Sequence, residues 1–189
     1  MKKLIIAAVV LVLAGCSTPR EPQLTIAPSP ASSNQQQVNN LPVVVKSKDL
    51  RTAQFVAVID SGRSNVKPLH ASQNLRVVLE DTLSRQLSSQ GFRVVANGPG
   101  MLRLDILDAL VRVKHTVFKH DMEASVQLQL VAESPDGRFV KRYTGKSTQS
   151  GVSSASPDDI ELALNNLLEA VLQDIANDEQ LLDHMKAHF

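Results

Sequence analysis

Cysteine and aromatic residues are scarce in this chain of 189 residues: it has one cysteine (Cys16), one tyrosine (Tyr143) and no tryptophan. With a single cysteine no intramolecular disulfide can form, so the fold must be held by its apolar core even in an oxidising compartment. The low aromatic content is a modest argument against a groove that stacks carbohydrate rings. The formal net charge of +1 is far from the strongly basic balance of a nucleic-acid binder, so nucleic acid is not an expected partner.

The N-terminus lacks an apolar run long enough to span a bilayer. The apolar stretch of residues 4–14 is about 11 residues long, whereas a transmembrane helix needs roughly 20. Lys2 and Lys3 precede this stretch and small residues follow it, which is the order of an export signal. The sequence therefore predicts a signal peptide over residues 1–15, cleaved between Gly15 and Cys16.

The residues Leu13-Ala14-Gly15-Cys16 resemble the lipobox of bacterial lipoproteins. The resemblance implies a diacylglyceryl thioether on the Cys16 sulfur and an acyl chain, such as palmitate, on its new amino group. Two or more acyl chains are what convert marginal membrane binding into stable anchoring. Ser17 and not aspartate follows the cysteine, which by resemblance to enterobacterial sorting implies the outer membrane, with the domain facing the periplasm. The alternative is an ordinary secreted protein with a chance cysteine near its cleavage site.

Residues 16–41 are predicted to form the lipidated cysteine and a flexible tether. This stretch is rich in proline, serine, glutamine and asparagine, and has few large apolar residues. It therefore cannot bury enough surface to offset the entropy lost on ordering. A flexible coil of this length has an r.m.s. span of roughly 25–30 Å, which would let the domain swing beneath the membrane. Residues 42–189 then have the length of one domain.

Alternating and β-branched apolar residues predict six strands, at residues 43–45, 54–59, 92–95, 101–115, 123–133 and 139–148. The first two strands are close enough in sequence to pair as a hairpin. The apolar phase of the long strand 101–115 slips by one residue, which predicts a β-bulge near Ile106 and Leu107. The strand 139–148 is more polar, so one face of the sheet is expected to be wet.

Two amphipathic helices are predicted. Ser72 is the expected N-cap of the first, which ends at Gly91, and its apolar residues recur at helical spacing. The second begins at Ser156 and Pro157, and a short terminal helix follows at residues 179–186. Together these elements predict a single α+β domain: a mainly antiparallel sheet with two main helices packed on one face, preceded by the flexible tether.

Several short segments resemble the YajG family of bacterial lipoproteins: Asp49-Leu50-Arg51-Thr52, Asn74-Leu75-Arg76-Val77-Val78-Leu79, Gln86-Leu87 continuing to Gly91-Phe92, Asn97-Gly98-Pro99, and Asn165 with Asp174 in the last long helix. The resemblance covers most of residues 42–186 and includes the lipobox, but not the tether. It implies an outer-membrane lipoprotein domain of unassigned biochemistry, so it brings no catalytic residues with it.

The turn between the two longest strands is a candidate interaction tip, formed by His115, Val117, Phe118 and His120. Two histidines near Asp121 could hold a metal, yet a metal site also needs converging geometry and a second shell of partners. A contact surface that is apolar or sensitive to pH, or a merely solvated turn, remain the other interpretations. His184 and His188 have helical i, i+4 spacing, but lack the glutamate of the H-E-x-x-H motif and lie at a chain end expected to fray. No metal site and no cofactor are predicted.

A catalytic set is not apparent in the sequence. It has no G-x-S-x-G motif and no phosphate-cradling glycine loop. Asp158 and Asp159 are explained by the helix dipole, because acids in a first turn complement its partial positive charge. An enzyme would need a cleft that brings together residues such as Asp105, Asp108 and the tip histidines. No catalytic residue is therefore assigned.

Two classes of function follow from these observations. The favoured hypothesis is a non-enzymatic interaction or accessory module of the cell envelope, anchored to the membrane through its lipid, which binds an envelope protein or a glycan through its wet sheet face or its tip. The alternative is a cell-wall-acting enzyme, or a carrier of a small apolar ligand held between sheet and helices. The oligomeric state is left open, including a homodimer through the strand at residues 139–148.

Overall fold

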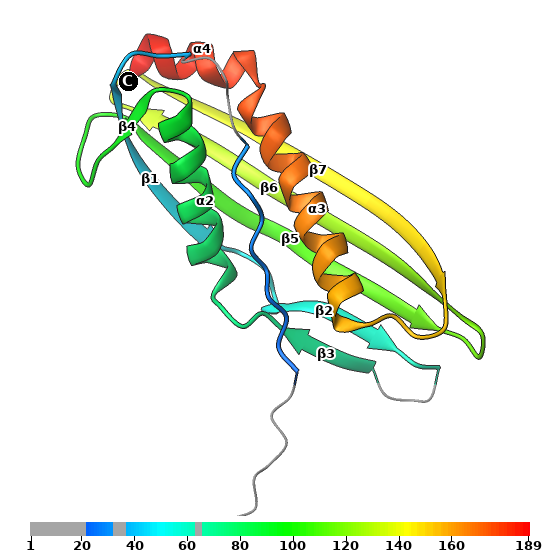
Figure 1. The fold of residues 1–189 in the computed structure, drawn as a ribbon. Coiled ribbons are helices and arrows are strands. Elements are labelled where there is room, and N and C mark those ends of the chain that lie inside the picture. Colours follow the sequence, from blue (N-terminus) through cyan, green and yellow to red (C-terminus); the bar gives the residue numbers. More distant parts are fainter. Residues whose placement is uncertain (1–21, 32–36, 63–65) are drawn as a thin grey trace, which may run out of the picture.

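The computed structural model describes residues 22–31, 37–62 and 66–189 (Figure 1). The predicted signal peptide, its cleavage position and Cys16 lie outside these residues. Within the described residues, seven strands and three helices follow one another: β1 (Leu41–Asp49), β2 (Phe55–Asp60), β3 (Val66–His70), α2 (Leu75–Ser89), β4 (Phe92–Val94), β5 (Met101–His115), β6 (Lys119–Ser134), β7 (Gly137–Val152), α3 (Pro157–Ala176) and α4 (Glu179–His188).

The sheet is organised around β5. One edge of β5 pairs antiparallel with β6, which in turn pairs antiparallel with β7. The other edge is shared by two short strands, since β1 pairs with residues 101–106 and β2 with residues 111–114, both in parallel. The hairpin predicted between β1 and β2 is therefore wrong, because two strands parallel to β5 cannot be antiparallel to each other. β2 instead forms a hairpin with β3, in which Pro68 lies opposite Val58.

The bulge predicted in the long strand is confirmed. The register between β5 and β6 shifts between Ile106 and Asp108, so Leu107 is the extra residue. Leu104 and Ile106 before the bulge and Ala109 and Val111 after it are all fully buried. The extra residue therefore keeps the apolar side chains of β5 on one face throughout its length.

Two long helices cover that apolar face, as predicted. α2 lies over β1 and β4, and α3 lies over β6 and β7 (Figure 1). The N-cap of α2 is Asn74 and not Ser72: the Asn74 side chain accepts from the Arg76 amide at 3.0 Å. The predicted start of α3 is confirmed, and Ser156 and Asp159 form a reciprocal capping box there. The class, a single α+β domain, is the predicted one.

The short helix α4 is docked on the sheet and buries Leu181 and Met185. Its N-cap, Asp178, accepts a hydrogen bond from the Tyr143 hydroxyl of β7. Lys141 Nζ lies 2.7 Å from the same carboxylate. These contacts tie the C-terminal helix to the last strand.

The main correction to the predicted organisation concerns residues 22–31, which we call the strap. The strap was assigned to the flexible tether, yet it runs between α2 and α3 (Figure 1) and packs against the domain. Leu24 and Ile26 are buried in the core, and the Leu24 amide donates to the His70 carbonyl at 2.8 Å. The boundary of the domain therefore lies before the predicted residue 42.

The strap is held because its spacing matches that of α3. The amides of Thr25, Ala27 and Ser29 donate to the side chains of Glu161, Asn165 and Glu169, at 2.6, 2.9 and 2.8 Å respectively. Two residues of extended chain advance about 6.6 Å, and four residues of helix advance about 6 Å, so successive strap amides meet successive turns of one helix face.

Candidate functional site

The predicted interaction tip is divided by the structure into an apolar apex and a packed base. At the apex, Val117 and Phe118 are 88% and 84% exposed. Val152 at the end of β7 is 86% exposed, and the neighbouring Ser153 amide donates to the Phe118 carbonyl at 3.2 Å. Among the described residues, these three are the most exposed large apolar side chains.

The two tip histidines turn back toward the domain. His115 Nε2 accepts from the Ala155 amide at 3.2 Å, and His120 Nδ1 lies 3.0 Å from the Ser153 carbonyl. Their ring centroids are 6.2 Å apart and His120 is largely buried. Both rings therefore hold the loop that leads into α3. Within the described residues, no three acidic, histidine or cysteine side chains converge as metal ligands.

The other histidine pair lies on α4. His184 stacks on Phe139 with ring centroids 5.4 Å apart, and the His188 ring is 4.5 Å from that of His184. Burial lowers the pKa of His184 below its ordinary value, and the proximity of His188 adds to this. These contacts give the pair a packing role at a chain end that was expected to fray.

The residues that an enzymatic cleft would need are dispersed. Asp105 and Asp108 point to the sheet face without helices, where Arg103 Nε donates to Asp105 at 2.9 Å and the Ser125 hydroxyl donates to Asp108 at 2.6 Å. His115 and His120 contact the loop before α3 instead. The structure therefore does not bring these four residues together as one acid and base set.

The Asp49-Leu50-Arg51-Thr52 segment has a structural role. The Arg51 guanidinium forms two hydrogen bonds to Asp49, at 2.9 and 2.8 Å, and donates to the carbonyls of Phe55 and Ala109. Burial alone would raise the pKa of Asp49, but the hydrogen bonds and charge of Arg51 hold it below its usual value. The segment thus fastens the turn between β1 and β2 to β5.

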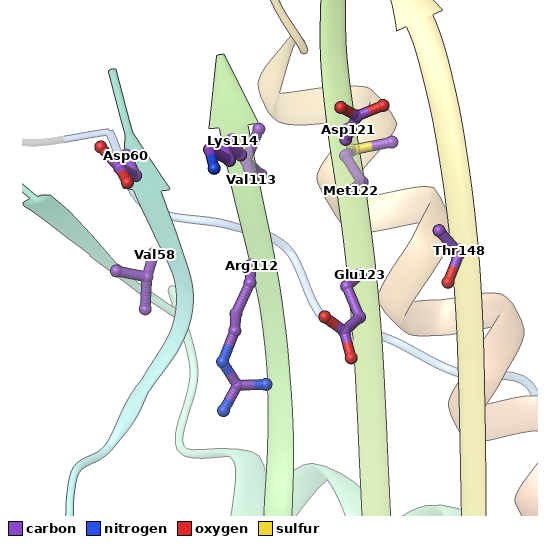
Figure 2. Close-up of a pocket in the computed structure, with 9 residues that line it drawn as sticks. All are labelled: Val58, Asp60, Arg112, Val113, Lys114, Asp121, Met122, Glu123 and Thr148. Carbon is purple, nitrogen blue, oxygen red and sulfur yellow. The ribbon is translucent and has the colours of Figure 1, made fainter. Parts of the chain in front are cut away.

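A hollow of about 430 Å³ lies on the helix-free face, toward the end of the sheet that carries the β5–β6 turn. Figure 2 shows a helix passing behind the strands, and Arg112, Lys114, Asp121 and Glu123 belong to the face that it does not cover, whereas Val113 and Met122 are buried in the core. The hollow is lined by Val58, Asp60, Arg112, Val113, Lys114, Asp121, Met122, Glu123 and Thr148. Its residues come from four strands, and of these only Asp121 was named from the sequence, as a neighbour of the tip histidines. Nothing local in the sequence marks where the sheet face is hollowed.

Charged side chains in the hollow lie opposite one another without pairing. Arg112 is the cross-strand neighbour of Glu123, and Lys114 that of Asp121. The Asp121 carboxylate accepts a hydrogen bond from the Ser150 hydroxyl at 2.7 Å and lies 3.0 Å from Lys119 Nζ. These interactions hold the pKa of Asp121 below its usual value. Among the described residues, Lys114 and Glu123 form no ion pair. The hollow therefore presents charge of both signs that the domain itself does not satisfy.

A small cavity reaches between the sheet and the helices. The cavity that lies there, bounded by residues of α2, α3, α4 and the sheet such as Leu102 and Met185, has a volume of about 10 Å³. A single water needs at least about that much space, so this cavity cannot hold a small apolar ligand.

The outer edge of β7 is the longest open edge that the described strands present. β7 pairs with β6 along its whole length and with no other described strand. Lys141 and Arg142 on this strand bring charge to the edge, which is a common protection against unwanted pairing between sheets.

No helix in the described part of the chain has the length and hydropathy needed to cross a membrane. Residues 28–186 match the model of a family described as "Uncharacterized lipoprotein". The chain is 27% identical over 190 residues to the uncharacterised lipoprotein YajG of Escherichia coli K12, a match that covers 98% of this chain and 97% of that protein. The corresponding protein of Escherichia coli O6:H1 gives the same values.

The fold is also found in a solved structure, protein XCC0632 from Xanthomonas campestris. The two chains are 15% identical and superpose with a TM-score of 0.59, over 88% of this chain and 96% of that one. At this identity the likeness concerns the fold alone.

Proposed function

Because this chain belongs to the family of uncharacterised lipoproteins, we propose that Cys16 carries a lipid anchor in the outer membrane and that the domain is a non-enzymatic interaction module in the periplasm. The hollow on the helix-free face is the proposed binding site, and its occupant is a segment of another envelope protein. The observation that carries this proposal is the unpaired charge of Lys114 and Glu123 in a hollow formed by four strands.

The chemistry of the hollow favours a peptide over a glycan. Its lining combines charges of both signs with the apolar side chain of Val58, and includes no aromatic ring on which a sugar could stack. A peptide segment with charges of alternating sign would satisfy Lys114 and Glu123 while covering Val58. Such charge complementarity fixes the register of a partner more than it adds affinity.

The anchor is tested separately from the hollow. Mass spectrometry of the N-terminal peptide from membranes is expected to show Cys16 as the first residue, with diacylglyceryl and acyl groups attached. The Cys16→Ser variant is expected to appear in the soluble periplasmic fraction. Membrane fractionation of the unchanged protein then distinguishes the outer from the inner membrane, and recovery with the inner membrane would contradict the sorting implied by Ser17.

The binding site is tested by photo-crosslinking in intact cells. A photo-reactive amino acid at Thr148, on the rim of the hollow, is expected to capture one reproducible envelope protein, whereas the same residue at Val77 on the outer side of α2 is not. The swap Lys114→Glu with Glu123→Lys keeps the net charge and should remove the crosslink. A matched swap on α2, Asp81→Arg with Arg85→Asp, reverses an exposed ion pair and should leave the crosslink unchanged. Equal capture by both swaps would contradict the proposal.

A further inference from the structure

We propose that the apolar apex of the tip, formed by Val117, Phe118 and Val152, contacts the lipid bilayer that holds the anchor. This inference rests on the lipid anchor proposed above, but not on the hollow or its partner. These are the most exposed large apolar side chains of the described residues, at 84–88%.

The chain enters the domain at the same end as the tip. Pro22 is the first described residue, and Thr25 is hydrogen-bonded to Glu161 near the start of α3. The loop just before α3 is bonded to the tip, through Ser153 to Phe118 and through Ala155 to His115. In Figure 1 the start of the strap, the end of β2, the start of β3 and the β5–β6 turn all lie in the lower part of the view. β4 and α4 lie at the opposite end.

The strap shortens the link between lipid and domain. Only six residue steps separate Cys16 from Pro22, and a fully extended chain covers at most about 3.6 Å per step, or about 20 Å in all. A tether that ran freely to residue 41 would have left the orientation of the domain open. With the strap bound between α2 and α3, the point where the chain enters the domain stays within about 20 Å of Cys16, so the end that carries the tip is the end held nearest the membrane.

The side chains at this end suit a shallow apolar contact. Val66, at the start of β3, adds a fourth apolar side chain that is more than half exposed. Lys114 and Lys119 are accompanied there by Asp60 and Asp121, so the charges largely balance. Insertion of apolar side chains, and not attraction to anionic lipid, would therefore hold the contact. It should then change little with salt, since screening acts on exposed charges.

The absence of tryptophan makes the contact directly measurable. Phe118→Trp and Val117→Trp each place one tryptophan at the apex, and Val94→Trp places one in β4 at the opposite end. The full lipidated chain of each variant is reconstituted in vesicles of phosphatidylethanolamine and phosphatidylglycerol that contain lipid brominated on its acyl chains. We expect the emission of both apex variants to shift to the blue and to be quenched, also at high salt, while that of Val94→Trp is neither shifted nor quenched.

Each outcome has a distinct meaning. Quenching of the apex variants no greater than that of Val94→Trp, with all proteins floating with the vesicles, would overturn the inference and leave the anchor intact. A blue shift that grows with protein concentration but is not quenched by brominated lipid would show that the apex binds a second copy of the chain, which also overturns it. Failure of the protein to float with vesicles would remove the anchor, and with it the basis for the contact.

Discussion

The strap and the tip apex are opposite in composition and opposite in environment. The strap is rich in proline and poor in large apolar residues, yet Leu24 is completely buried; the apex carries Val117 and Phe118, yet both stand almost fully exposed. The difference lies in the partners that each segment meets. The strap finds a helix with acceptors at matching intervals, whereas the apex extends beyond the ends of the neighbouring strands and helices.

Hydrogen-bonding partners therefore decide order here as much as apolar content does. An extended segment in water keeps its amides hydrated, and it gains from docking only if each buried amide finds an acceptor. Glu161, Asn165 and Glu169 supply those acceptors from one face of α3. A segment with only two large apolar residues, Leu24 and Ile26, can thus be held in the domain.

The contribution of the strap to stability is tested most directly at Leu24. Leu24→Ala removes a fully buried side chain, and such changes cost about 2–5 kcal/mol in the free energy of unfolding. Urea denaturation of the soluble Cys16→Ser form measures this cost, with Gln23→Ala as a control at an exposed neighbouring position. A loss equal to that of the control would show that the strap contributes nothing to stability.

The base of the tip is expected to be sensitive where its apex is not. A Cβ added at Gly151 would come within 2.5 Å of the His120 ring, and overpacking of this kind costs about 1–3 kcal/mol. Gly151→Ala should therefore lower the urea midpoint. Gly62→Ala, in the loop after β2, adds a methyl group to open space but at a positive φ, so its smaller loss measures backbone strain alone. No loss in Gly151→Ala would mean that His120 is not packed as described.

Asn165 tests the match between strap and helix without touching the core. Its side chain accepts from the Ala27 amide and donates to the Thr25 carbonyl, and net hydrogen bonds of this kind contribute about 1 kcal/mol each. Asn165→Ala should lower stability by about 1–2 kcal/mol and speed proteolysis within the strap. Asn166→Ala, the next residue on the same helix, is the control, and equal proteolysis of the two variants would contradict the match.

The smallest effect on stability is expected at the apex. Phe118→Ser should change the free energy of unfolding by less than about 0.5 kcal/mol, because the side chain it removes is exposed in the folded state. The same urea denaturation detects any larger loss, which would mean that Phe118 is packed in the free protein. The strap and the apex would then no longer differ in packing.

Much of the fold could be predicted from local patterns. The bulge at Leu107 followed from the phase slip in β5, and the start of α3 followed from Ser156 and Pro157. The N-cap of α2 was misplaced by two residues, because Ser72 and Asn74 are both good caps and only the helix axis selects between them. The hollow escaped prediction, since it depends on how four strands curve together.

By itself the sequence determined the periodic elements, the faces that they bury and the resemblance to a lipoprotein family, because these depend on residues close together in the chain. Only the tertiary structure decided that β1 and β2 share one edge of β5 and that the strap binds between α2 and α3. Such pairings join segments far apart in sequence. They depend on the strand edges and hydrogen-bond acceptors that stay unpaired after the other elements have packed. The strap amides, more than 130 residues from their acceptors in α3, are the clearest case.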